Sequence, residues 1–247
     1  MELTERLHFD HEDRRDVYEY VEAHGTVRAG EARRALNLDP EAFGHHVTVL
    51  RRDGYIRREG NHLRVAYQEE TAEHHDTTGL AYTIRAAEQS DLSGLIGVIR
   101  EVAEEGTYIE AETVADLLDH EEVILRHNDV RSRMVFVATV DDEVVGWVHL
   151  DLPEMEKLSH TAVLTVGLLP DHRGNGIGGA LLDRGVRWAR EHDFEKLYNS
   201  VPSTNESAVT FLESCGWEIQ AIREDHYRID GDYVDEVMLA TWLSDRD

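Results

Sequence analysis

The stretch from residue 161 to 191, TAVLTVGLLPDHRGNGIGGALLDRGVRWARE, constrains the fold most, because it joins a strand, a glycine-rich turn and a helix. The apolar, β-branched run 162–169 predicts a buried strand that ends at Pro170, which has no N–H for a sheet. Apolar residues then recur at helical spacing from Ile177. The turn and the helix start contain Gly174, Gly176, Gly178 and Gly179. Such a turn directs backbone N–H groups and the helix dipole at an anion, so the stretch predicts a phosphate cradle.

Two nucleotide-binding patterns fit these glycines. Gly174, Gly176 and Gly179 satisfy the dinucleotide fingerprint G-x-G-x-x-G, which requires repeated strand–helix–strand units. The pattern begins at residue 174 of 247, however, and only one strand, one helix and a hairpin are predicted after it. The alternative is R-x-x-G-x-G, formed by Arg173, Gly176 and Gly178 after a strand that ends in V-x-x-x-P. This second arrangement resembles the acetyl-CoA pyrophosphate loop of the GNAT superfamily of N-acetyltransferases.

A second string supports the resemblance. Asn205-x-x-Ala208-x-x-Phe211-Leu212-x-x-x-Gly216-Trp217 is similar to the family's N-x-x-A-x-x-L-Y-x-x-x-G-F. The element order predicted from residue 80 onwards, β α α β β β α β α β β, matches the whole GNAT fold and leaves no span for a second Rossmann half. The resemblance therefore implies an α/β acyl-CoA N-acyltransferase fold, with a mixed and splayed central sheet, over residues 80–247.

The resemblance also implies acetyl-CoA as co-substrate and identifies residues that would bind it. Backbone N–H groups of residues 174–179 would hold the pyrophosphate. The strand near Val166 and Leu168 would pair with the pantetheine arm, and the Leu168 N–H would polarise the thioester carbonyl. Arg173 would add charge near the phosphates or hold the loop, and Asn205 would bond the pantetheine or cap its helix. No metal is expected, and the binding candidates are Val166, Leu168, Arg173, Gly174, Asn175, Gly176, Ile177, Gly178, Gly179, Asn205 and Ala208.

The family's reaction is direct attack of a neutral amine on the thioester within a ternary complex, so a base need only deprotonate an ammonium. Base candidates near the splaying strands are His149, Asp151 and His160. The C-terminal string REDHYRIDGDYVDEVMLA resembles the last hairpin of relatives that act on small amines, amino acids or protein N-termini. The acceptor is therefore expected to be a small-molecule or protein amine.

Leu212 departs from the family pattern. Many relatives carry a tyrosine there, thought to protonate the leaving thiolate, and leucine has no proton to donate. Tyr227, Ser207, Cys215 or water would have to supply the acid, or catalysis would rely little on one. A domain that binds acetyl-CoA without turning it over, as the sensor of a transcriptional regulator, is the alternative.

Residues 1–68 predict a separate small domain. Asp10 can cap a helix that Gly25 ends, a second helix follows, and Asp39-Pro40 opens a third helix that stops at Gly54. A β-hairpin comes next. The string LNLDPEAFGHHVTVLRRDGYI resembles the second and third helices of winged-helix regulators, which implies a winged helix-turn-helix α+β domain. The polar residues 69–79 are expected to form a linker to the second domain.

The winged-helix resemblance implies DNA binding through residues 39–64, with wing residues Arg57, Arg58 and Arg64 near phosphates. Residues 27–64 hold 8 Arg against 5 acidic residues, so this segment is basic. The expected groove-facing positions carry no basic side chain, and a module for dimerisation or intramolecular docking is the alternative. Those positions are Glu41, Ala42, Gly44, His45 and Thr48.

The composition indicates the environment in which the protein works. The formal net charge is -26 at pH 7, and only Lys157 and Lys196 among the 25 basic residues are lysines. Repulsion between so many carboxylates is screened by concentrated salt, which suggests a halophilic archaeon. A single cysteine and the absence of long apolar runs predict a cytoplasmic protein without membrane spans, in which a homodimer is one expectation. The adjacent pairs His45-His46 and His74-His75 lack the partner spacing of a metal motif.

Overall fold

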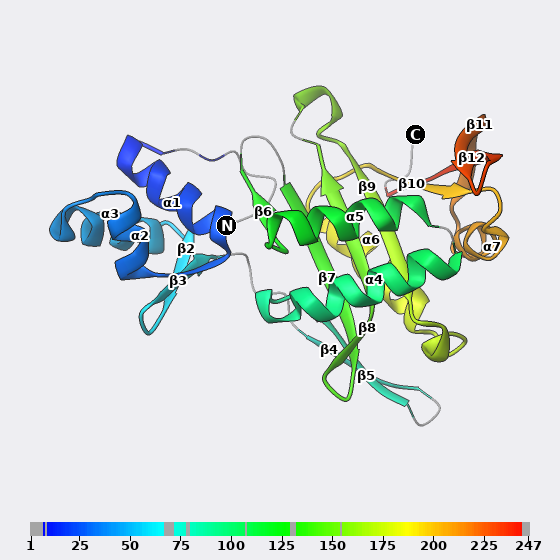
Figure 1. Cartoon of the computed structure of the whole chain (residues 1–247), viewed down its shortest axis with the longest axis horizontal. Helices are drawn as coiled ribbons and strands as arrows, with labels where there is room; N and C mark the ends of the chain where they lie inside the picture. The colour runs from blue at the N-terminus through cyan, green and yellow to red at the C-terminus, as the bar shows by residue number, and fades with distance from the viewer. Residues whose placement is uncertain are drawn as a thin grey trace.

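The computed structural model of the chain describes two parts, each with its own β-sheet and its own apolar core, that lie side by side (Figure 1). The N-terminal part has a three-stranded sheet in the order β1-β3-β2. The second part has a nine-stranded sheet. The structure describes residues 7, 9–66, 72–77, 80–106, 108–128, 132–153 and 155–243.

The three helices and the hairpin of the N-terminal part occur where the sequence predicted them. Their apolar faces enclose a core that includes the fully buried Tyr18, Leu50 and Leu63. The predicted cap of the third helix is confirmed, because Asp39 Oδ1 accepts a hydrogen bond from the Glu41 N–H at 2.8 Å. The elements are α1 (Glu12–His24), β1 (Thr26–Arg28), α2 (Ala29–Ala35), α3 (Pro40–Arg52), β2 (Ile56–Glu59) and β3 (His62–Val65).

Two details of this part correct the sequence prediction. The first helix is capped by His11, whose Nδ1 accepts a hydrogen bond from the Asp13 N–H at 3.2 Å. Asp10 lies one residue too early for this role, and its carboxylate is 3.7 Å from Arg14 Nη1. Strand β1 was not predicted, because a strand of three residues is too short to show a periodic pattern.

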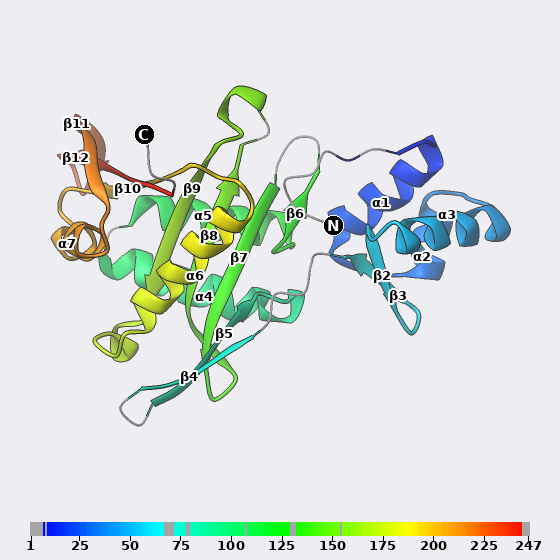
Figure 2. The same cartoon turned by 180° about the vertical axis from the view of Figure 1, so that it is seen from behind.

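The second part is a mixed sheet with helices on both faces. The strand order is β11-β12-β10-β9-β8-β7-β5-β4, and β6 pairs with β7. Helices α4 and α5 lie on one face and α6 on the other (Figures 1 and 2). The elements are β4 (Glu73–Thr77), β5 (Leu80–Ala86), α4 (Leu92–Gly106), α5 (Ile109–Glu121), β6 (Arg126–His127), β7 (Ser132–Val140), β8 (Glu143–Leu152), β9 (Thr161–Leu168), α6 (Ile177–Glu191), β10 (Lys196–Pro202), α7 (Glu206–Ser214), β11 (Glu218–Ile229) and β12 (Asp232–Trp242).

The sheet separates two apolar cores, as the alternation of side chains along a strand requires. On β8, Trp147 joins the core under α4 and α5, whereas its neighbour Val148 joins the core under α6. Both side chains are fully buried. The element order predicted from residue 80 onwards is confirmed, and β6 is the one added strand among the described residues.

Two boundaries in this part were predicted wrongly. Residues 73–77 of the expected linker form β4, which pairs antiparallel with β5, and Glu73 binds Arg187 Nη2 of α6 at 2.9 Å. This edge strand was not predicted because its sequence is polar. The expected linker residues 69–71 and 78–79 lie outside the described residues. Helix α5 also starts three residues earlier than predicted, at Ile109, and ends at Glu121.

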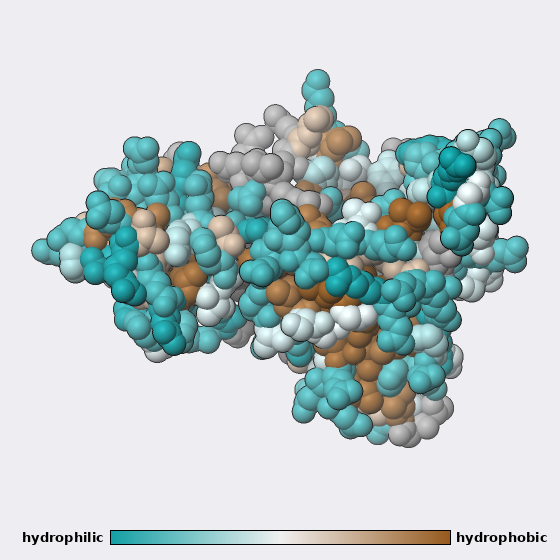
Figure 3. Space-filling view, in the orientation of Figure 1, coloured by the Kyte–Doolittle hydropathy of each residue, from teal (hydrophilic) through white to brown (hydrophobic). Residues whose placement is uncertain are grey.

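The surface is strongly polar in keeping with the composition. Hydrophilic residues cover most of the face shown in Figure 3, with apolar side chains visible between them. Within the ranges that the structure describes, none of the helices combines the length and the apolar character that crossing a bilayer requires.

Glu22 of α1 forms the centre of the contact between the two parts. Its side chain is 4% exposed, and its carboxylate accepts hydrogen bonds from Arg126 Nη1 at 3.2 Å, the His127 N–H at 3.1 Å and Asn128 Nδ2 at 3.0 Å. Tyr18, also on α1, donates its hydroxyl proton to the His127 carbonyl at 2.9 Å. A buried carboxylate is tolerated only when its oxygens are bonded, so these contacts fix α1 against β6.

Replacing Glu22 by alanine would remove the acceptor that Arg126 and the His127 N–H share. We expect the free energy of unfolding to fall by about 2–4 kcal/mol, measured by urea unfolding at high salt. Glu19→Ala is the matched control, because Glu19 lies on the exposed side of the same helix. The control should change the free energy by less than about 0.5 kcal/mol. Equal losses for the two variants would contradict an anchoring role for Glu22.

Candidate active site

The site forms where two parallel strands at the centre of the sheet separate. β9 and β10 pair over only three positions, from Lys196 opposite Thr161 to Tyr198 opposite Val163. Beyond these positions β9 remains paired with β8, and β10 with β12. A gap therefore opens between the two strands towards the C-terminal end of β9, as the expected splayed sheet requires.

Asn199 and Tyr108 occupy the point where the gap begins. Asn199 is 1% exposed, and its Nδ2 donates to the Leu164 carbonyl at 2.7 Å. The Tyr108 hydroxyl donates to Asn199 Oδ1 at 3.3 Å, and the Val166 backbone also bonds this hydroxyl. Burial raises the pKa of the Tyr108 phenol, so the phenol keeps its proton at neutral pH. Sequence analysis missed both residues, and the one signal in the sequence is a polar Asn within a buried strand.

The N–H groups of Val166 and Leu168 of β9, the two residues expected to pair with the pantetheine arm, point towards the gap. The Leu169 N–H donates to the Val145 carbonyl of β8 at 2.9 Å. Because N–H groups point alternately to the two sides of a strand, those of Leu168 and Val166 point away from β8, towards β10. The bond between the Val166 backbone and Tyr108 agrees with this direction.

The glycine-rich loop adopts the geometry that its sequence predicted. Gly174 and Gly176 have φ of 78° and 83°, a left-handed region that favours glycine. Gly176 is the N-cap of α6 and makes no side-chain cap, so the first N–H groups of this helix are left for another acceptor. The space where a Cβ of either glycine would lie is open. Ile177, fully buried, anchors the helix start in the core, and Gly178 faces Phe211 of α7.

Arg173 holds the loop in place. Its Nε donates to the Leu168 carbonyl at 2.9 Å, and its two terminal nitrogens bind the carboxylate of Glu105, at the end of α4, at 3.1 and 2.6 Å. Asn175 Nδ2 donates to the Arg173 carbonyl at 3.2 Å. The loop is thus tied to both β9 and α4, and the loop-holding alternative for Arg173 is the one this geometry favours. Gly179 lies in the first turn of α6.

The second motif forms α7 beside this loop. Asn205 is the N-cap, and its Oδ1 accepts a hydrogen bond from the Ala208 N–H at 3.2 Å, as the capping alternative required. Phe211 lies against the start of α6. Leu212 is 2% exposed and belongs to the core, so an apolar side chain is what this position accommodates here.

The base candidates lie at different distances from the gap. His149 of β8 is buried, lies opposite Thr165 of β9, and faces Thr165 Oγ1 at 3.5 Å from its Nδ1. By strand alternation it shares the face of Trp147, which α4 and α5 cover. Asp151 lies opposite Val163, where the strands are still paired. His160 precedes β9, about 25 Å from its C-terminal end at about 3.3 Å per residue. The structure therefore brings His149 nearest to the gap and separates His160 from it.

Tyr227 belongs to a cluster of charged groups next to the gap. Glu236 of β12 is 3% exposed, lies opposite Pro202 at the end of β10, and its Oε2 is 3.0 Å from Arg223 Nη1 and 3.6 Å from His226 Nε2 of β11. Burial, followed by the charges of Glu236 and Glu110, raises the pKa of the Tyr227 phenol. Burial and the charge of Glu236 also raise the pKa of the Glu110 carboxyl, in the first turn of α5. The acidic members of this cluster are Glu110 and Glu236.

Residues 99–217 match the model of the Acetyltransferase (GNAT) family. Two curated relatives are each 27% identical over 93 residues, which is 37% of this chain. They are the probable N-acetyltransferase san of Drosophila melanogaster, matched over 50% of its length, and N-alpha-acetyltransferase 50 of Danio rerio, matched over 55%. The chain thus spans about half the length of these relatives.

Solved structures share the fold of the second part. A putative acetyltransferase from Salmonella typhimurium, solved with its cofactor acetyl-CoA, superposes with a TM-score of 0.55 at 18% identity, over 67% of this chain and 96% of that one. A GNAT-family acetyltransferase from Streptococcus pneumoniae gives a TM-score of 0.53 at 19% identity, over 65% and 99% of the two chains. Residues 99–217 thus match the GNAT family model, and the second part of the chain shares the fold of these two solved structures.

Proposed function

We propose that the protein transfers the acetyl group of acetyl-CoA to a primary amine by direct attack within a ternary complex. The observation that carries this proposal is the uncapped, glycine-rich start of α6 next to the gap between β9 and β10. N–H groups at this helix start suit a pyrophosphate, which is anionic and needs several donors at close range. The gap suits the extended pantetheine arm, which can pair with a strand that lacks a neighbour.

The thioester would lie next to the Leu168 N–H of β9, because Tyr108 already bonds the Val166 backbone. The Leu168 N–H points towards the gap, and a donor there stabilises the oxyanion that forms when the amine attacks. The transfer itself needs no metal, because the thioester is already an activated acyl donor.

The acceptor amine would approach from the cluster at α5, β11 and β12. Glu110 and Glu236 provide two carboxylates near the end of β10, and such groups attract an ammonium ion before it loses its proton. His149, on the strand beside β9, is the base candidate nearest to the gap, and we propose that it removes the proton directly or through water. For the acceptor we propose a chemical class and not one compound. The class is an amine, carried by a small molecule, an amino acid or a protein N-terminus.

Binding and turnover separate this proposal from an acetyl-CoA sensor. We expect calorimetry to give one acetyl-CoA site per chain. A thiol-release assay on a panel of small amines, amino acids and peptide N-termini should then show free CoA with at least one acceptor. Binding without CoA release from any amine would favour the sensor.

Gly176→Val tests the loop. Valine is strained at a φ of 83° and its branched side chain would fill the cradle, so we expect acetyl-CoA affinity to fall at least about 100-fold. Gly97→Ala in α4 is the matched control, since no atom lies within 4 Å of the added Cβ and alanine favours a helix. Unchanged affinity in Gly176→Val, measured by calorimetry, would overturn the assignment of the loop.

Tyr108 is our candidate for the acid that protonates the leaving thiolate, because its protonated hydroxyl lies at the start of the gap while Leu212 is buried in the core. Tyr108→Phe should lower kcat by about 100-fold and leave acetyl-CoA affinity within about threefold of the original. Tyr227→Phe is the matched comparison, and we expect it to change kcat by less than tenfold. The reverse ranking of the two variants would assign the acid to Tyr227.

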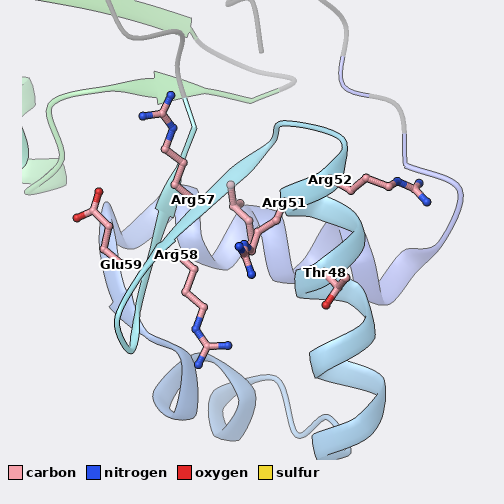
Figure 4. A pocket seen from close by; sticks show the side chains of 7 residues that line it. Thr48, Arg51, Arg52, Arg57, Arg58 and Glu59 are labelled. Atoms are coloured by element: carbon pink, nitrogen blue, oxygen red, sulfur yellow. The ribbon is translucent and has the colours of Figure 1, made fainter.

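DNA binding is a second candidate function, supported by a basic surface on the N-terminal part. The order α1-β1-α2-α3-β2-β3 supports this candidate, because it is the order expected for a winged helix-turn-helix. In Figure 4, Arg51 of α3 and Arg58 of β2 point into the hollow between the helix and the hairpin. Arg52 is occupied by Asp53 at 2.7 Å, and Arg64 by Glu59. Figures 1 and 2 show α3 on the side of this part that faces away from the second part.

Arg51→Ala and Arg58→Ala should each weaken binding to duplex DNA and reduce the slope of log K against log salt by about one. Arg228→Ala on β11 is the control, because it removes the same charge from the other part of the molecule. Fluorescence anisotropy over a salt series measures the slope. No binding, or binding that does not depend on salt, would favour intramolecular docking as the role of this part.

A further inference from the structure

Three side chains with metal-ligand chemistry meet between the start of α1 and the middle of α3. They are His11, Asp13 and His46. Asp13 Oδ2 is 3.6 Å from His46 Nε2 and 3.9 Å from His11 Nδ1. One ligand atom from each of the three residues lies within 4.8 Å of the other two. The two rings lie close together, with centroids 4.8 Å apart.

His46 is a buried imidazole with an unused nitrogen. Its side chain is 7% exposed, Nε2 is the nitrogen that faces Asp13, and the buried Nδ1 on the other side of the ring has no hydrogen-bond partner among the described residues. The neutral form of an imidazole is the one that binds metals. The adjacent His45 is exposed, and its ring centroid is 5.8 Å from that of His46.

We propose that His11, Asp13 and His46 bind a divalent transition-metal ion such as Zn²⁺ or Co²⁺. Two imidazoles and one carboxylate are ligands that these ions prefer, whereas Mg²⁺ and Ca²⁺ prefer oxygen alone. Metal–ligand bonds of about 2.0–2.1 Å in a tetrahedral site set ligand atoms about 3.4 Å apart. The present separations, which reach 4.8 Å, need a contraction of up to about 1.4 Å, and the half-exposed His11 can supply it by turning its ring and giving up its bond to the Asp13 N–H.

Other charges around the three residues limit the affinity but do not remove the site. Arg14, on the same helix, and the neighbouring His45 both act on His46 with a positive charge, and Asp13 opposes them. Three protein ligands leave a fourth position for water, so we expect an exchangeable ion rather than a closed structural site. Sequence spacing alone does not reveal this site, because His11-x-Asp13 and His46 come together only when α1 packs on α3.

The ion would brace α1 against α3 and would take no part in acetyl transfer. Both helices belong to the N-terminal part, and the gap of the transferase site lies between strands of the second part. Metal occupancy is therefore expected to change the stability of the N-terminal part and to leave acetyl-CoA binding unaffected.

The test uses the full-length protein after treatment with a chelator. Co²⁺ should bind with visible ligand-field absorption, at one ion per chain, and Zn²⁺ should displace it. His11→Asn keeps an acceptor for the helix cap but removes the imidazole, and it should weaken Co²⁺ binding at least about tenfold. His45→Asn is the matched control on α3 and should bind Co²⁺ as the original protein does. Asp13→Asn is expected to resemble His11→Asn.

A thermal readout separates metal binding from a simple ion pair between Asp13 and a protonated histidine. Zn²⁺ should raise the melting temperature of the original protein and of His45→Asn, and should have little effect on His11→Asn. Equal Co²⁺ spectra in all variants would overturn the site, since they would show binding by other histidines among the 15 in the chain. Loss of binding in His45→Asn with retention in His11→Asn would also overturn it.

Discussion

The incomplete pairing of β9 with β10 is the constraint on which the site depends. Each buried backbone N–H or C=O needs a partner, so two strands cannot part inside a sheet without a substitute for the lost ladder. The protein supplies that substitute with side chains: Asn199 binds the Leu164 carbonyl, and Tyr108 binds Asn199 and the Val166 backbone. Beyond Tyr108 β9 has no paired strand on this side, and this is the part of the edge that the proposed pantetheine arm would occupy. The same residues therefore stabilise the gap and border the proposed reaction site.

The elements around the gap hold it rigidly from several directions. The loop is tied to α4 through Arg173 and Glu105, and α7 contacts the start of α6 through Phe211. At the far edge of the sheet, Glu73 of β4 binds Arg187 of α6. A helix start that is fixed in this way presents its N–H groups without reorganisation, which favours tight binding of an anion. Preorganisation is also what the proposed mechanism needs, because direct attack gains most from proximity.

Local sequence patterns predicted the elements of the second part well. They could not predict contacts between residues that are far apart in the sequence. Gly174 and Gly176 could be recognised because a turn that brings its backbone close to an anion favours glycine, and the order of the elements along the chain followed from hydrophobic periodicity. Tyr108 and Asn199 are 91 residues apart, so no spacing marks their contact. The charged cluster of Glu110 and Glu236 is hidden in the same way, since its members come from α5 and β12. Strand β4 was missed because its edge position allows a polar sequence.

Helix α1 connects the features that lie outside the proposed transferase site. Its first turn carries Asp13 next to His46 of α3, and its last two turns carry Tyr18 and Glu22, which bind the segment around β6. β6 pairs with β7, a central strand of the second part. Helix α1, of 13 residues, therefore contacts both α3 and β6. It is the element through which the core of the N-terminal part is joined by hydrogen bonds to the sheet of the second part.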